Sequence, residues 1–161
     1  MGKELENYEE VKYDFEYIEE ANFESSVRSY YVLLWDHLLK YKFNTPKQST
    51  SWLDSINKSI NLINDIRNNK SINISNTWKN FVKNSQDCEK EFNKAIKEAA
   101  KQNFMDKRLF YRSLADAISD EPVFDPINAL DRNIVKQYLL KYYDPNAKDS
   151  KDVIRDIEAK F

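Results

Sequence analysis

The chain has 161 residues, of which 41% are hydrophobic and 14% aromatic, so it can fold around one substantial core. Its only glycine is Gly2, which argues strongly against a sheet protein with tight hairpin turns and excludes glycine-rich phosphate loops and dinucleotide-binding fingerprints. The only cysteine, Cys88, excludes an internal disulfide and a thiolate metal cluster.

Charge is segregated along the chain, although the net charge is only −2. Residues 1–25 carry nine acidic side chains against two lysines, whereas residues 26–115 carry sixteen basic side chains against eight acidic ones. This asymmetry indicates electrostatic contacts, either with a partner or, as we favour, between an acidic N-terminal helix and the basic middle of the same chain. No apolar run approaches the ~18 residues of a membrane span, and residues 3–20 are too acidic for a signal peptide. We therefore expect a cytoplasmic protein that does not associate with membranes.

Apolar residues at three- and four-residue steps predict an amphipathic helix at about residues 4–18 and a second helix at about residues 23–41. The second helix has few polar positions, so we expect it to be central. Asn44-Thr45-Pro46 should end it, because the residue before a proline disfavours the helical conformation.

A third helix is predicted from about Ser51 to Ile66, because isoleucines recur along one face of this segment. Ser49, Thr50 and Ser51 offer N-cap hydroxyls, and Ser51 with Asp54 fits a capping box.

The rest of the chain also reads as helical, in segments separated by polar or proline-containing loops. Pro126 suits the first turn of one helix, and Ser150 suits the N-cap of the last. The predicted helices cover about residues 75–99, 104–118, 126–142 and 150–157. The sequence thus predicts a compact all-α bundle of six or seven helices, with the hairpin of the second and third helices at its centre.

The junction of the second and third helices carries a distinctive pattern, His37-Leu-Leu-Lys40-Tyr, then Pro46 and Lys47, then Ser51-Trp52 and Ile56. This pattern resembles the bacterial family known as domain of unknown function 29, over about residues 8–102. The resemblance implies an all-helical bundle with no established activity. Residues 1–102 would form this bundle, and residues 103–161 a helical extension packed on the same core or a small subdomain.

His37 has the side chain best suited to proton transfer near neutral pH, so it is the first candidate for chemistry. A His–hydroxyl pair across the 42–51 loop is one interpretation, but we favour a structural one, in which His37 donates to a loop carbonyl. Trp52 should then pack on the second helix near Trp35 and Leu38. The candidate motif His37, Lys40, Ser51 and Trp52 is accordingly interpreted as architectural.

No catalytic, cofactor or metal site is predicted. A di-metal bundle site needs Glu-x-x-His pairs on two helices, and the sequence contains neither such a pair nor a second histidine. We lean away from an enzyme for the same reason, since no catalytic constellation is visible.

Two surfaces remain as candidates for binding. Tyr30, Tyr31, Tyr41, Tyr142 and Tyr143 exceed what one small core needs, so they are either core or an exposed recognition patch. A second candidate is a basic helical face, formed by Lys79, Lys83, Lys90, Lys94, Lys97 and Lys101. We predict a non-enzymatic protein–protein interaction module with an unidentified protein partner. The alternative is a nucleic-acid-associated factor using the basic face, although interspersed acids and a pI near 5.6 favour a solvated surface.

Overall fold

The computed structural model describes residues 23–69, 79, 90 and 121–161. These residues form four α-helices and three short 3₁₀ helices, without a strand among them, so the predicted all-α class is confirmed. The predicted count of six or seven helices is not supported by these four. The helices predicted near residues 4–18, 75–99 and 104–118 lie outside the described residues, apart from Lys79 and Lys90, which are both helical. The predicted contact between the acidic N-terminal helix and the basic middle also lies outside them.

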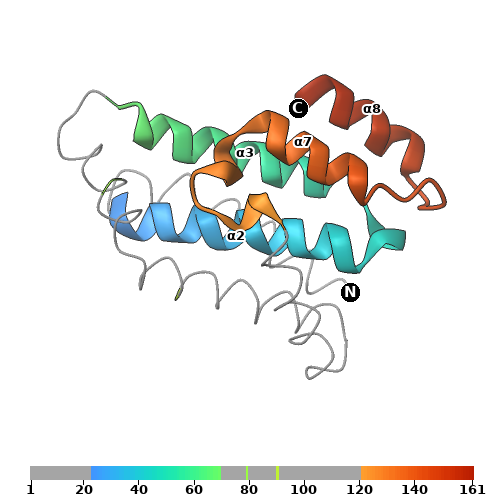
Figure 1. The fold of residues 1–161 in the computed structure, drawn as a ribbon, viewed down its shortest axis with the longest axis horizontal. Coiled ribbons are helices and arrows are strands. Elements are labelled where there is room, and N and C mark those ends of the chain that lie inside the picture. Colours follow the sequence, from blue (N-terminus) through green and yellow to red (C-terminus); the bar gives the residue numbers. More distant parts are fainter. Residues whose placement is uncertain (1–22, 70–78, 80–89, 91–120) are drawn as a thin grey trace.

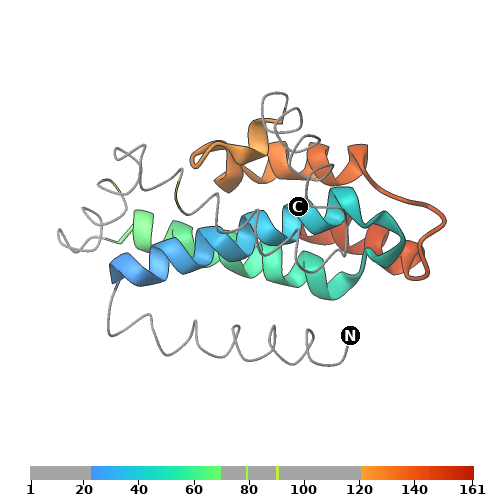
Figure 2. The same ribbon diagram turned by 90° about the horizontal axis from the view of Figure 1, so that it is seen from below.

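The centre of the described structure is a hairpin of two long helices, α2 (Phe23–Phe43) and α3 (Thr50–Arg67), as the sequence predicts. They run side by side in both views of the ribbon and share the most extensive contact of any two described elements (Figures 1 and 2). A short 3₁₀ helix, η1 (Thr45–Lys47), joins them, with Pro46 in its first turn. The proline thus ends α2 where the sequence predicts, since the chain continues in a tighter turn.

The N-cap of α3 is Ser49, not Ser51. Ser49 has extended backbone angles (φ −145°, ψ 160°), and its hydroxyl accepts a hydrogen bond from the main-chain nitrogen of Trp52. Ser51 lies inside the first turn, where its exposed hydroxyl is 3.0 Å from that of Ser49. The predicted Ser51–Asp54 capping box is therefore wrong, because the helix begins earlier and Asp54 pairs instead with Lys160.

The C-terminal part contains η2 (Pro122–Phe124), η3 (Asn128–Leu130), α7 (Arg132–Lys141) and α8 (Ser150–Lys160). The prediction that a helix begins at Pro126 is wrong. The Asp125 carboxylate accepts hydrogen bonds from the next turn, and the Asp131 carboxylate accepts from the main-chain nitrogens of Asn133 and Ile134 at 2.9 and 3.2 Å. Because Asp131 caps α7, the preceding residues form separate short turns.

One hydrophobic cluster unites the four α-helices with η2 and η3. The isoleucine stripe of α3 is buried as predicted, and it meets the aromatic face of α2. Val135, Tyr138 and Leu139 of α7 and Val153 and Ile157 of α8 belong to the same cluster. The predicted division at residue 102 stays a prediction, because residues 91–120 lie outside the described part. Among the described helices, none combines the length and the apolar character needed to cross a bilayer.

Candidate functional site

Three ionisable side chains of the predicted motif region are buried together on one side of α2. Asp36, His37 and Lys40 are only 3%, 2% and 3% exposed. The Asp36 carboxylate lies 3.1 Å from the Lys40 ammonium and 4.0 Å from Nδ1 of His37. The step of four residues between Asp36 and Lys40 places them one turn apart on the same face, which permits the ion pair.

The hydrogen bond at His37 fixes the orientation of its ring. Nδ1 lies 2.8 Å from the carbonyl oxygen of Leu33, one turn earlier in α2. A carbonyl oxygen only accepts, so Nδ1 carries the proton and donates it. This bond stays within the helix, whereas we predicted one to the 42–51 loop. Because the ring is 2% exposed, no solute reaches it in this structure, and the arrangement favours an architectural role.

The residue that holds the loop is Gln48, which sequence reasoning missed. Its side chain is 1% exposed, and its Nε2 donates to the carbonyl oxygens of Tyr41 and Tyr142 at 2.9 and 2.7 Å. Its Oε1 accepts from the main-chain nitrogen of Asp144 at 3.0 Å. Gln48 therefore fastens the end of α2 to the segment after α7. The only signal in the sequence is its place directly before the N-cap of α3.

Ser51 and Trp52 lie at the start of α3, and no contact described in the structure joins them to His37 and Lys40. Ser51 is exposed, and Trp52 is half-buried against the edge of the core. Trp52 packs against the hydrophobic cluster that contains Trp35 and Leu38, and its predicted position near these two residues stays a prediction. The Trp35 ring contacts that of Tyr31 at 4.9 Å between centroids with a tilt of 36°, and its Nε1 donates to the carbonyl oxygen of Val123 at 3.2 Å.

The tyrosines of α2 belong to the core. Tyr30, Tyr31 and Tyr41 are fully buried, so the exposed-patch interpretation is wrong for these three. The hydroxyl of Tyr31 donates to the carbonyl oxygen of Pro126 at 2.7 Å, which satisfies its polar end inside an apolar cluster. Burial raises the pKa of the Tyr41 hydroxyl above its usual value, and burial also raises the pKa of Tyr138.

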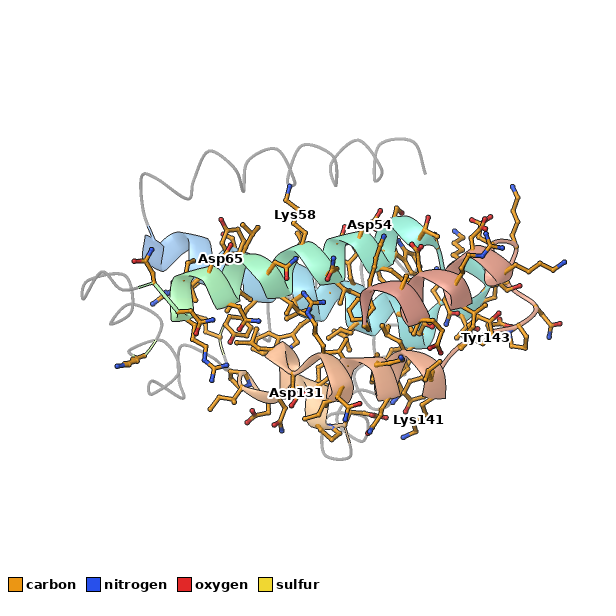
Figure 3. All side chains as sticks on the ribbon, turned by 90° about the horizontal axis from the view of Figure 1, so that it is seen from above. Asp54, Lys58, Asp65, Asp131, Lys141 and Tyr143 are labelled. Carbon is orange, nitrogen blue, oxygen red and sulfur yellow. The ribbon has the colours of Figure 1, made fainter. Side chains whose placement is uncertain are left out.

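Two partly exposed aromatic side chains, Phe43 and Tyr142, lie where α2 and α7 end. We name this region the aromatic–lysine surface, and it consists of Lys42, Phe43, Leu140, Lys141 and Tyr142. The Lys42 ammonium lies 4.7 Å from the ring centroid of Tyr142 and 5.4 Å from that of Phe43, and the Lys141 ammonium lies 5.2 Å from the Tyr142 centroid. Leu140 is 40% exposed in the last turn of α7. Figure 3 shows Lys141 at the end of α7 and Tyr143 in the segment that follows.

One buried carboxylate, that of Glu121, contacts three residues of the aromatic–lysine surface. Glu121 is 7% exposed, and its Oε1 accepts a hydrogen bond from the Tyr142 hydroxyl. The ammonium groups of Lys42 and Lys141 lie 3.6 and 3.2 Å from the same oxygen. The hydrogen bond to Glu121 is the main cause that raises the pKa of Lys141. The Tyr142 ring also meets Tyr138 edge-on at 5.0 Å, so it is fixed against the core.

A family model described as domain of unknown function DUF29 matches residues 15–135. The chain belongs to this family. The match confirms the resemblance seen in the His37–Trp52 pattern. It extends beyond the predicted limit at residue 102 and ends in the first turns of α7, so the rest of α7 and all of α8 are unmatched. Searches of curated proteins and of solved structures gave no match.

The predicted basic face of this DUF29 chain is described at two positions. Lys79 and Lys90 are exposed, and Lys83, Lys94, Lys97 and Lys101 lie outside the described residues. In the part of the chain that the structure describes, no group of three or more His, Cys, Asp or Glu side chains could hold a metal ion.

Proposed function

We propose that this DUF29 chain is a non-enzymatic protein–protein interaction module, and that its partner binds the aromatic–lysine surface. The observation that carries the proposal is the half-buried ring of Tyr142 with two ammonium groups around it, at the end of α7, whose last turn also exposes Leu140. Aromatic and aliphatic groups at the centre of a patch, with charged groups at its rim, are typical of protein interfaces.

The fixed positions of the rings support this proposal. The Tyr142 hydroxyl bonds to Glu121, and its ring meets that of Tyr138 edge-on. The ring therefore has little conformational freedom to lose when a partner binds. Binding surfaces that are ordered beforehand lose less conformational entropy on association. The same contacts explain how a half-buried tyrosine remains part of a stable fold.

The charges of the surface indicate the chemistry of the partner. Two ammonium groups meet one carboxylate here, which leaves a positive excess, and the side chain of Lys141 is 59% exposed. A partner segment with a carboxylate next to an apolar side chain would complement both features. We also propose a cytoplasmic location.

The test is affinity capture from the native host followed by titration of the isolated partner. Leu140→Glu should abolish the binding of a stoichiometric partner. Ile127→Glu is the matched control, because Ile127 is 49% exposed and lies before α7 rather than at its end. Equal binding by the two variants would contradict the aromatic–lysine surface as the site. Thermal melts of both variants check that each remains folded.

The nucleic-acid alternative rests on the exposed helical positions of Lys79 and Lys90. Binding to duplex or single-stranded probes at about 50 mM salt, weakening steeply as salt rises, would favour it. The double variant Lys79→Glu/Lys90→Glu should then lose binding, while Leu140→Glu keeps it. No binding at this salt concentration removes the alternative.

A further inference from the structure

We draw no further inference here: the strongest candidate, the buried cluster of Asp36, His37 and Lys40 on α2, belongs to the site already described, and because these residues are at most 3% exposed, nothing in the structure shows a ligand that could reach them.

Discussion

The hydroxyl of Tyr41 donates to the carbonyl oxygen of Leu139 at 2.7 Å, across 98 residues of sequence. A reciprocal bond runs from the Tyr138 hydroxyl to the carbonyl oxygen of Leu38 at 2.5 Å. Each helix therefore satisfies a buried polar group of the other, and α2 and α7 are locked in register by two bonds in opposite directions. Tyr138 is 3% exposed and Tyr41 is fully buried, so neither bond exchanges freely with water.

Removing one of these bonds should lower stability without changing the fold. Tyr41→Phe leaves a buried carbonyl without its donor, which should reduce the free energy of unfolding by about 1–3 kcal/mol. Tyr143→Phe is the matched control, because the Tyr143 hydroxyl bonds to the carbonyl oxygen of Ser150 at a part-buried position. Urea denaturation followed by circular dichroism measures both changes. A larger loss for Tyr143→Phe than for Tyr41→Phe would contradict this account.

Alkaline pH should destabilise the chain through the same tyrosines. Burial is the main cause that raises the pKa of Tyr41 and of Tyr138 in the folded state, so folding favours their protonated forms. This stabilisation is fully present below the ordinary tyrosine pKa near 10 and decreases as the pH rises above it. Denaturation midpoints measured between about pH 8 and pH 11 should fall at the alkaline end, and Tyr41→Phe should make the decline less steep. A parallel decline in wild type and variant would exclude Tyr41 as its cause.

Periodicity predicted the parts of the fold that depend on local pattern. The helical class, the α2–α3 hairpin and the buried stripe of Ile56, Ile60 and Ile63 follow from apolar residues at helical spacing. The stop at Pro46 follows from local stereochemistry. Helix starts were less predictable, because several hydroxyls and carboxylates compete for each cap, as Ser49 and Ser51 do at α3.

The tertiary hydrogen bonds could not be predicted, because their acceptors are main-chain carbonyls with no signature in the sequence. Trp35 donates a hydrogen bond to Val123, 88 residues later in the sequence, and Tyr31 donates one to Pro126, 95 residues later. The five-residue aromatic–lysine surface has the same origin, since its members come from two distant segments and Glu121 joins them. The surplus of tyrosines was the visible signal, and burial assigns Tyr30, Tyr31 and Tyr41 to the core, whereas Tyr142 and Tyr143 are half-buried.

Gln48 should matter more for stability than its ordinary sequence context suggests. Gln48→Ala removes three hydrogen bonds and leaves two carbonyls and one amide without these partners, so unfolding should require about 2–4 kcal/mol less. Ser51→Ala, at the exposed position nearby, should change stability by no more than about 0.5 kcal/mol. Thermal and urea unfolding compare the two. Equal effects would mean that the loop is held by other contacts.

Breaking the buried ion pair of Asp36 and Lys40 should lower the free energy of unfolding strongly, whereas replacing both residues by apolar ones should lower it little. Lys40→Met leaves the Asp36 carboxylate buried without this cation, and the free energy of unfolding should fall by about 3–5 kcal/mol. The double variant Asp36→Leu/Lys40→Met should recover most of this loss, because apolar side chains of similar volume avoid the desolvation of two charges. If the effects of the two single substitutions simply add in the double variant, the two charges do not interact.

His37→Gln removes one hydrogen bond to Leu33, so it should lower the free energy of unfolding by only about 1 kcal/mol.

The two tryptophans of the central hairpin should differ in their contribution to stability. Trp35 is 1% exposed, contacts the ring of Tyr31 and donates to Val123, so Trp35→Ala should lower the free energy of unfolding by about 3–5 kcal/mol. Trp52 is half-buried at the start of α3, and its truncation removes less apolar area from the core, so Trp52→Ala should cost about 1–3 kcal/mol. Urea denaturation of the two variants at the same pH gives the comparison. If Trp52→Ala lowers the free energy of unfolding more than Trp35→Ala does, Trp52 contributes more to the core than its partial burial indicates. If Trp52→Ala is stable but loses a captured partner that Leu140→Glu retains, the binding surface lies at the start of α3 rather than at the ends of α2 and α7.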